Sequence, residues 1–78
     1  MFQTWRFRLR EAEEALKAGR LDESRRLLAE GELSEFLPGK RLAARLAGRF
    51  AERARQLGQA GDWEAGWRDL EVACSLAD

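Results

Sequence analysis

The residues of this sequence best suited to bind a charged ligand are four arginines near its middle. Arg41, Arg45, Arg49 and Arg53 recur at every fourth position, which places them on one face of a helix. Guanidinium groups in such a row can bind the carboxylates of an acidic peptide, or a phosphate group, through paired hydrogen bonds. The alternative is a solvated face balanced by Glu52 and by acids of neighbouring helices. The spacing alone leaves both interpretations open.

Groups for catalysis or metal binding are scarce. The 78-residue chain contains no histidine and a single cysteine, Cys74. It therefore lacks the side chain that most often acts as a general base near neutral pH, and one cysteine cannot complete a zinc site. Cys74 lies one turn after Leu70 with no cation close to it, which predicts a small core residue rather than a reactive thiol. We expect a protein that is not an enzyme and holds no cofactor and no metal.

Charge and composition narrow the class of partner. Lysine and arginine total 14, aspartate and glutamate total 14, and the formal net charge is zero. This balance, with no aromatic residues interleaved in the arginine stripe, argues against nucleic acid. No apolar run approaches the roughly 20 residues of a membrane span, and no targeting segment is evident, so we expect a cytoplasmic protein. Residues 40–55 are mainly basic and residues 62–78 mainly acidic, a segregation that can cancel within the fold or align two copies head to tail.

The apolar spacing predicts an all-α fold. Helices are expected at about 2–18, 21–30, 38–60 and 63–77, and Gly19 and Gly61 stop the first and third of them. These helices form two antiparallel hairpins in a single domain of residues 1–78. The predicted parts are hairpin 1 at about 2–31, a connecting segment at 31–39 and hairpin 2 at about 38–77. Apolar residues within the connecting segment predict a short helical turn that caps the core.

Two sets of apolar residues are expected on the last helix. The first is a broad inner face, expected in the core: Trp63, Gly66, Trp67, Leu70, Ala73, Cys74 and Ala77. The second is a ridge of Val72 and Leu76, displaced from Leu70. Phe7 is likewise displaced from the inner stripe of the first helix. We expect Phe7, Val72 and Leu76 to remain uncovered and to bind a protein partner.

An internal repeat accompanies this pattern. Forty-two residues separate Gly19 from Gly61, and the same offset relates Ala12 to Ala54 and Ala18 to Ala60. A period in this range is typical of stacked helical hairpins.

The second hairpin resembles a tetratricopeptide repeat. The residues that carry the resemblance are Ala54, Leu57, Gly58, Gly61-Asp62-Trp63, Leu70, Ala73 and Leu76-Ala77-Asp78. Gly66 stands where that family usually has alanine. The first hairpin matches the family less well. There, Ser24 replaces the usual alanine, Gly31 falls where a small residue is expected, and the linker is longer than the family's period allows. The resemblance implies helical hairpins packed as a bundle, with the arginine-bearing helix lining a groove. The family's carboxylate clamp needs asparagine, which this chain lacks.

A second resemblance concerns the N-terminal part. Residues 7–13 followed by 18–23 are similar to leader modules of some bacterial multidomain signalling proteins, which precede a forkhead-associated domain. The expected function is a non-catalytic interaction or scaffold module that forms a homodimer or docks a partner helix or peptide. The alternative is a regulatory leader that recognises an acidic or phosphorylated ligand through the stripe of Arg41, Arg45, Arg49 and Arg53.

Overall fold

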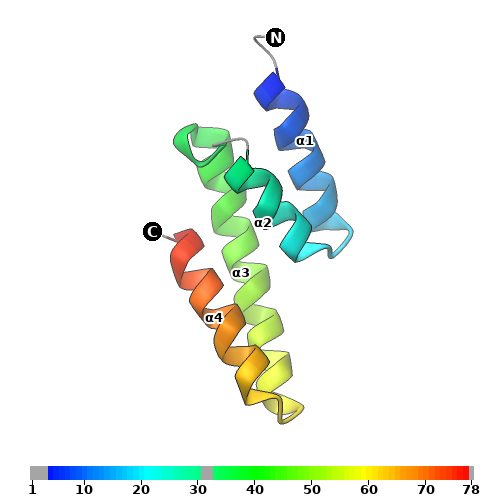
Figure 1. The fold of residues 1–78 in the computed structure, drawn as a ribbon, viewed down its shortest axis with the longest axis vertical. Helices are drawn as coiled ribbons and strands as arrows, with labels where there is room; N and C mark the ends of the chain where they lie inside the picture. Colours follow the sequence, from blue (N-terminus) through cyan, green and yellow to red (C-terminus); the bar gives the residue numbers. More distant parts are fainter. Residues whose placement is uncertain (1–3, 31–32, 78) are drawn as a thin grey trace. The chain divides into compact units, whose positions relative to one another are not determined.

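The computed structural model describes residues 4–30 and 33–77, and every regular element in them is a helix (Figure 1). The elements are α1 (Thr4–Lys17), α2 (Leu21–Glu30), the 3₁₀ turn η1 (Leu33–Glu35), α3 (Leu37–Gln59) and α4 (Trp63–Ala77). The all-α prediction is confirmed, and the expected helices match within a few residues. The predicted positions 2, 3 and 31 lie outside the described residues.

The described chain divides into two compact units between Ala43 and Ala44. The first contains α1, α2, η1 and the start of α3. The second contains the rest of α3 and α4. In each unit two helices joined by a tight turn lie side by side and run in opposite directions (Figure 1), as the prediction of antiparallel hairpins requires. The prediction of a single domain stays a prediction.

The turn of the first hairpin is closed by backbone hydrogen bonds around a glycine. Gly19 has φ of 84°, in the left-handed region that glycine enters without strain. Its N–H donates to the carbonyl of Leu16 at 3.0 Å, and the N–H of Arg20 donates to the carbonyl of Ala15 at 2.8 Å. These two bonds satisfy carbonyl groups that the end of a helix would otherwise leave unpaired.

The second hairpin repeats this turn forty-two residues later. Gly61 has φ of 90° and donates to the carbonyl of Gly58 at 3.0 Å, while Asp62 donates to Leu57 at 2.8 Å. Asp62 then caps α4, because its Oδ1 accepts from the N–H of Ala65 at 3.2 Å. The predicted repeat is therefore present in the hydrogen bonds of the backbone.

The paired helices also meet at equivalent places. In the first unit the buried hydroxyl of Ser24 donates to the carbonyl of Ala12 at 2.8 Å. In the second unit the matching residues are Gly66 and Ala54, and a Cβ added to Gly66 would lie 3.2 Å from the carbonyl oxygen of Ala54. Each hairpin is thus built on a close contact between a small residue of one helix and the backbone of the other.

The turn η1 closes the first hairpin. Leu33 is fully buried, and η1 packs against both α1 and α2. The next residue after η1, Phe36, stacks on Trp5 with ring centroids 5.4 Å apart, although both rings keep some exposure. The predicted helical turn is confirmed. The buried residues of the first unit are Ala12, Ala15, Leu16, Leu21, Ser24, Leu27, Leu28, Leu33, Leu42 and Ala43, with Gly39 among them.

The core of the second unit is smaller. Its fully buried bulky side chains are Leu46 and Phe50 on α3, and small residues complete it: Ala47, Ala54, Gly66 and Ala73. Leu57 on α3 is only half-buried. A core with so few large side chains leaves apolar residues of α4 without space inside.

Two glycines of α3 provide a matched test of the packing. A Cβ at Gly39 would overlap the backbone carbonyl of Leu33, whereas a Cβ at Gly48 would meet nothing within 4 Å. We expect Gly39→Ala to lower the free energy of unfolding by more than about 2 kcal/mol, because the backbone of η1 must move. Gly48→Ala should raise it by roughly 0.5–1 kcal/mol through helix propensity. Urea unfolding followed by circular dichroism measures both, and equal effects would contradict the close contact at Gly39.

Candidate functional site

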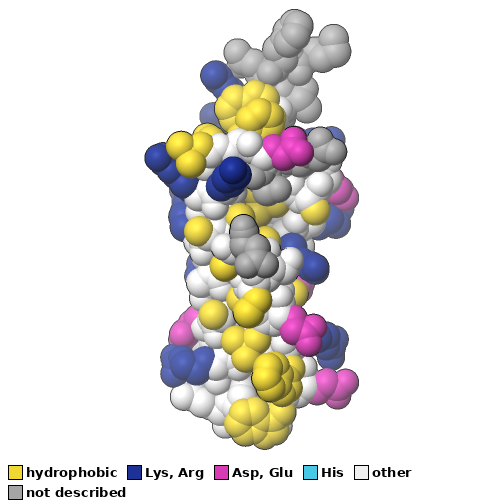
Figure 2. Space-filling view, turned by 90° about the vertical axis from the view of Figure 1, so that its left-hand side faces the viewer, with side chains coloured by type: hydrophobic (Ala, Val, Ile, Leu, Met, Phe, Trp, Pro, Cys, Tyr) yellow, Lys and Arg dark blue, Asp and Glu magenta, His cyan; other side chains and the backbone are white. Residues whose placement is uncertain are grey.

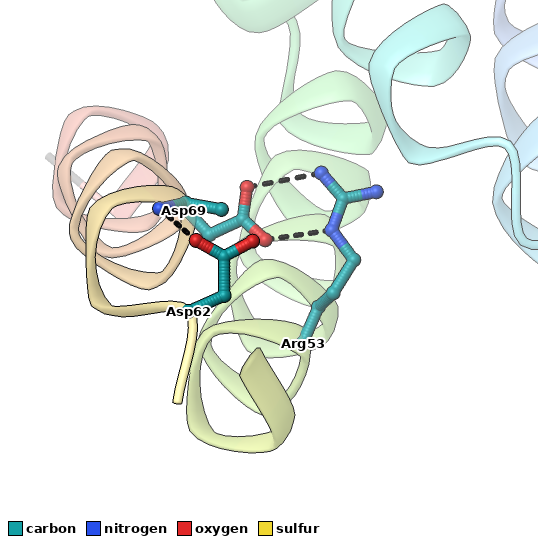
Figure 3. A network of polar contacts seen from close by, with 4 residues as sticks. Arg53, Asp62 and Asp69 are labelled. Atoms are coloured by element: carbon teal, nitrogen blue, oxygen red, sulfur yellow. Dashed lines mark hydrogen bonds and ion pairs between the residues drawn. The ribbon is translucent and has the colours of Figure 1, made fainter. Parts of the chain in front are cut away.

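One ion pair joins the two helices of the second unit (Figure 3). The Arg53 guanidinium donates from Nε to Oδ2 of Asp69 at 2.6 Å and from a terminal nitrogen to Oδ1 at 3.0 Å. Asp69 is only 7% exposed, and the guanidinium also lies over the ring of Phe50, 5.0 Å from its centroid. This two-pronged pairing compensates a carboxylate that burial would otherwise make costly.

The predicted arginine stripe is accordingly divided. Arg53 is engaged with Asp69, whereas Arg41, Arg45 and Arg49 are exposed along α3. Arg41 belongs to the first unit and the other three to the second. Arg53 therefore links α3 to α4 through Asp69. Recognition of an acidic or phosphorylated ligand stays a prediction.

An open apolar surface lies between α3 and α4. A hollow of about 460 Å³ is present there, entirely within the second unit. Its lining is apolar apart from Arg55 and Gln59. The residues that line it are Ala51, Ala54, Arg55, Gly58, Gln59, Trp63, Gly66, Trp67 and Leu70. Figure 2 shows large hydrophobic side chains gathered at the lower end of the molecule, where the turn between α3 and α4 lies in Figure 1.

Large side chains form the α4 wall of this hollow and face the solvent. Trp63 is 69% exposed, Trp67 66% and Leu70 40%. A Cβ at Gly58 would lie 3.2 Å from the six-membered ring of Trp63, so that ring lies across the glycine rather than between the helices. The prediction that these three residues are core is wrong, because the small residues of α3 and α4 bring the helices too close to admit them.

The prediction for Cys74 is wrong for the same reason, since its side chain is exposed. The exposed apolar residues of α4 recur at alternating steps of four and three: Trp63, Trp67, Leu70, Cys74 and Ala77. We call this set the α4 seam. Its spacing is that of residues that pack against another helix, and it is readable from the sequence. The sequence interpretation merged it with the buried strip of Gly66 and Ala73.

The three residues predicted to bind a protein partner lie in different settings. Phe7 is on α1 in the first unit and is 66% exposed. Val72 and Leu76 are on α4 in the second unit and are half-buried. The role of the three residues in binding a protein partner stays a prediction.

Charged residues border the hollow and the seam. Arg55 lines the hollow and donates to Glu52 from Nε at 3.1 Å. This hydrogen bond lowers the pKa of the Glu52 carboxyl below its ordinary value, and it raises the pKa of Arg55. The pair is therefore charged at neutral pH. On α4, the exposed acids Glu64 and Glu71 each follow a seam residue in the sequence.

Other kinds of site find no support in the described residues. Within 4–30 and 33–77, no group of three or more acidic or cysteine side chains could hold a metal ion. No helix in the described part of the chain is both long and apolar enough to cross a membrane. Comparison with protein-family models, curated proteins and solved structures finds no match to this chain. The likeness to tetratricopeptide repeats and to bacterial leader modules stays a prediction.

The contribution of the Arg53–Asp69 pair to stability can be tested by replacing it with apolar residues, as the first hairpin has at the position of Asp69. Forty-two residues before Asp69 stands Leu27, which is buried. Arg53→Met should lower the free energy of unfolding by about 2–4 kcal/mol, because it leaves Asp69 without its partner. Adding Asp69→Leu should restore stability to within about 1 kcal/mol of the parent. Thermal and urea unfolding measure both variants.

The exposed pair of Glu52 and Arg55 is the control. Glu52→Gln should change stability by less than about 0.5 kcal/mol, as exposed pairs contribute little. A loss in Arg53→Met no larger than that of Glu52→Gln would show that the buried pair does not hold the hairpin together.

Proposed function

We propose that this protein is a non-catalytic binding module whose second unit receives the apolar face of a helix. The observation that carries the proposal is the α4 seam beside the hollow, where two tryptophans and a leucine are exposed together. Contiguous apolar surface of this kind is costly to leave in water and is typical of a site for another protein. Aromatic residues such as Trp63 and Trp67 are also the types that most often anchor such interfaces.

The spacing of the seam favours a helix as the occupant. Residues at alternating steps of four and three present a straight apolar strip to a second helix. The small residues Ala51, Ala54 and Gly58 on the α3 side let a helix backbone approach closely.

The first unit supports the same interpretation by comparison. Leu16, Leu21 and Leu28 are buried, and they correspond in the repeat to Gly58, Trp63 and Leu70 of the open surface. In the first unit the helical turn η1 packs against both helices of the hairpin. A helical segment from a partner would give the second unit the closure that η1 gives the first.

Binding is a better account of the hollow than catalysis. Apart from Arg55 and Gln59 its lining offers no polar side chain, and the chain contains no histidine. Arg55 is already paired with Glu52. An exposed single thiol, Cys74, suits the reducing conditions of a cytoplasmic location, which we also propose.

A synthetic helix provides the test of the binding site. The probe is a 14-residue peptide of leucine and lysine, with leucines at alternating steps of three and four. In a variant with Trp5→Phe and Trp63→Phe, Trp67 is the only tryptophan and reports on the seam. We expect the peptide to shift its fluorescence emission to shorter wavelengths in a saturable way, because the ring leaves water.

Two controls make the test specific. A peptide of the same composition with the leucine spacing scrambled should give no saturable shift. Adding Leu70→Glu to the reporter variant should weaken binding by about tenfold or more, because a carboxylate then enters an apolar contact. Equal binding of both peptides, or binding unaffected by Leu70→Glu, would exclude this surface as a helix site.

The second candidate function is recognition of an acidic or phosphorylated ligand, and the exposure of Arg45 on α3 favours it. Its affinity should fall steeply with salt. Arg45→Glu combined with Arg49→Glu should abolish binding of an acidic phosphopeptide measured by calorimetry. Binding that ignores both salt and these substitutions would exclude the arginine stripe as the site.

A further inference from the structure

We infer that the helix received by the second unit belongs to a second copy of this chain, with α4 of each copy packed against α3 of the other. The inference rests on the proposed function, because it uses the same open surface. It adds the identity of the partner and the pairing of the helices. Three features of the second unit support it: the sizes of the exposed residues, their spacing and the charges beside them.

In the second unit, the exposed apolar residues of α3 are small, whereas Trp63, Trp67 and Leu70 on α4 are large. Ala44 and Gly48 are exposed and Ala51 is half-buried, at the same alternating steps of four and three as the α4 seam. A Cβ at Gly48 would meet nothing within 4 Å, so the backbone is open to an incoming side chain. Ala51 also lines the hollow, which makes this strip continuous with it. Tryptophans on one strip and small residues on the other form a surface complementary to itself.

Such a surface suits a twofold dimer. In a twofold arrangement the same patch is used by both copies, and each contact occurs twice. The large residues of α4 then pack against the small strip of the partner's α3, and the partner's α4 does the same in return. Pairing of α4 with α4 would instead set tryptophans against tryptophans and leave both small strips uncovered.

The charges beside the two strips favour the same pairing. Arg45 and Arg49 are exposed and directly follow Ala44 and Gly48 on α3, with Glu52 after Ala51. On α4 the exposed residues beside the seam are Glu64, Arg68 and Glu71. Packing α4 on the partner's α3 sets a mainly acidic border against a mainly basic one, which steers association and selects the partner. Packing α4 on α4 would set two mainly acidic borders together. With a formal net charge of zero, the chain as a whole does not oppose self-association.

Sedimentation equilibrium of the whole chain over a wide concentration range tests for the dimer. We expect a monomer–dimer equilibrium that Trp67→Gln weakens by about tenfold or more, as expected for a buried aromatic anchor. Phe7→Gln is the matched control, because Phe7 is an equally exposed aromatic residue in the first unit. A loss of dimer in Phe7→Gln with none in Trp67→Gln would overturn the inference and favour the surface predicted from the sequence.

Charge reversal tests which helices pair. One variant carries Arg45→Glu, so that both of its borders are mainly acidic. The other carries Glu64→Lys with Glu71→Lys, so that both are basic. Each alone should dimerise roughly fivefold more weakly than the parent at low salt, and a mixture of the two should form a mixed dimer. Circular dichroism confirms that each variant is folded. Undiminished dimerisation of Arg45→Glu alone would overturn the pairing of α4 with α3.

The dimerisation and peptide-binding experiments together distinguish failure of this inference from failure of the proposed function. A chain that stays monomeric at the highest concentration but binds the leucine–lysine peptide at Trp67 overturns the second copy and leaves the helix site standing. A chain that neither dimerises nor binds the peptide overturns both. A dimer that Trp67→Gln weakens, together with charge variants that pair more tightly when mixed than alone, supports both.

Discussion

Both hairpins depend on a place where one helix contacts the backbone of the other through a small residue. In the first unit Ser24 fills this place and donates its hydroxyl to the carbonyl of Ala12. In the second unit Gly66 leaves almost no space between α4 and the carbonyl of Ala54. The distance between the paired helices is set there, and it determines which neighbouring side chains can enter the core. A larger residue at either place would separate the helices and loosen everything packed around them.

The two units meet this constraint with different residues, and the difference creates the open apolar surface of the second unit. The first unit places leucines around Ser24, and η1 covers the hairpin with Leu33. The second unit has glycine and tryptophan where the first has Leu16 and Leu21, so its core is thin and its largest side chains remain outside. Arg53 and Asp69 compensate in part, since their two hydrogen bonds link the helices where apolar packing is limited. In the second unit, the residues that hold the two helices together are therefore separate from the large apolar residues that stay exposed.

The helices and turns could be predicted from the sequence because their signals are local. Gly19 and Gly61 end helices through their own backbone freedom, and the forty-two-residue offset follows from matching letters. The candidate site could not be predicted in the same way. Apolar residues occupy much of the circumference of α4, and hydropathy alone does not say which strip is buried. The strip of Gly66 and Ala73 is buried because close approach of the backbones favours small side chains over Trp63 and Trp67. The partner of Arg53 depends on the alignment of the two helices, which spacing within one helix does not reveal.

The hydrogen bonds that link the helices also affect the order in which parts of the chain fold during synthesis. The bond from Ser24 to Ala12 spans 12 residues and the pair of Arg53 and Asp69 spans 16, so each hairpin closes over a short stretch of chain. Short loops are closed at low entropic cost, and topologies rich in local contacts fold fast. The first hairpin can therefore form once α2 has left the ribosome, before α4 has emerged. The exposed residues Trp63, Trp67 and Leu70 thus leave the ribosome after the first hairpin has been able to fold.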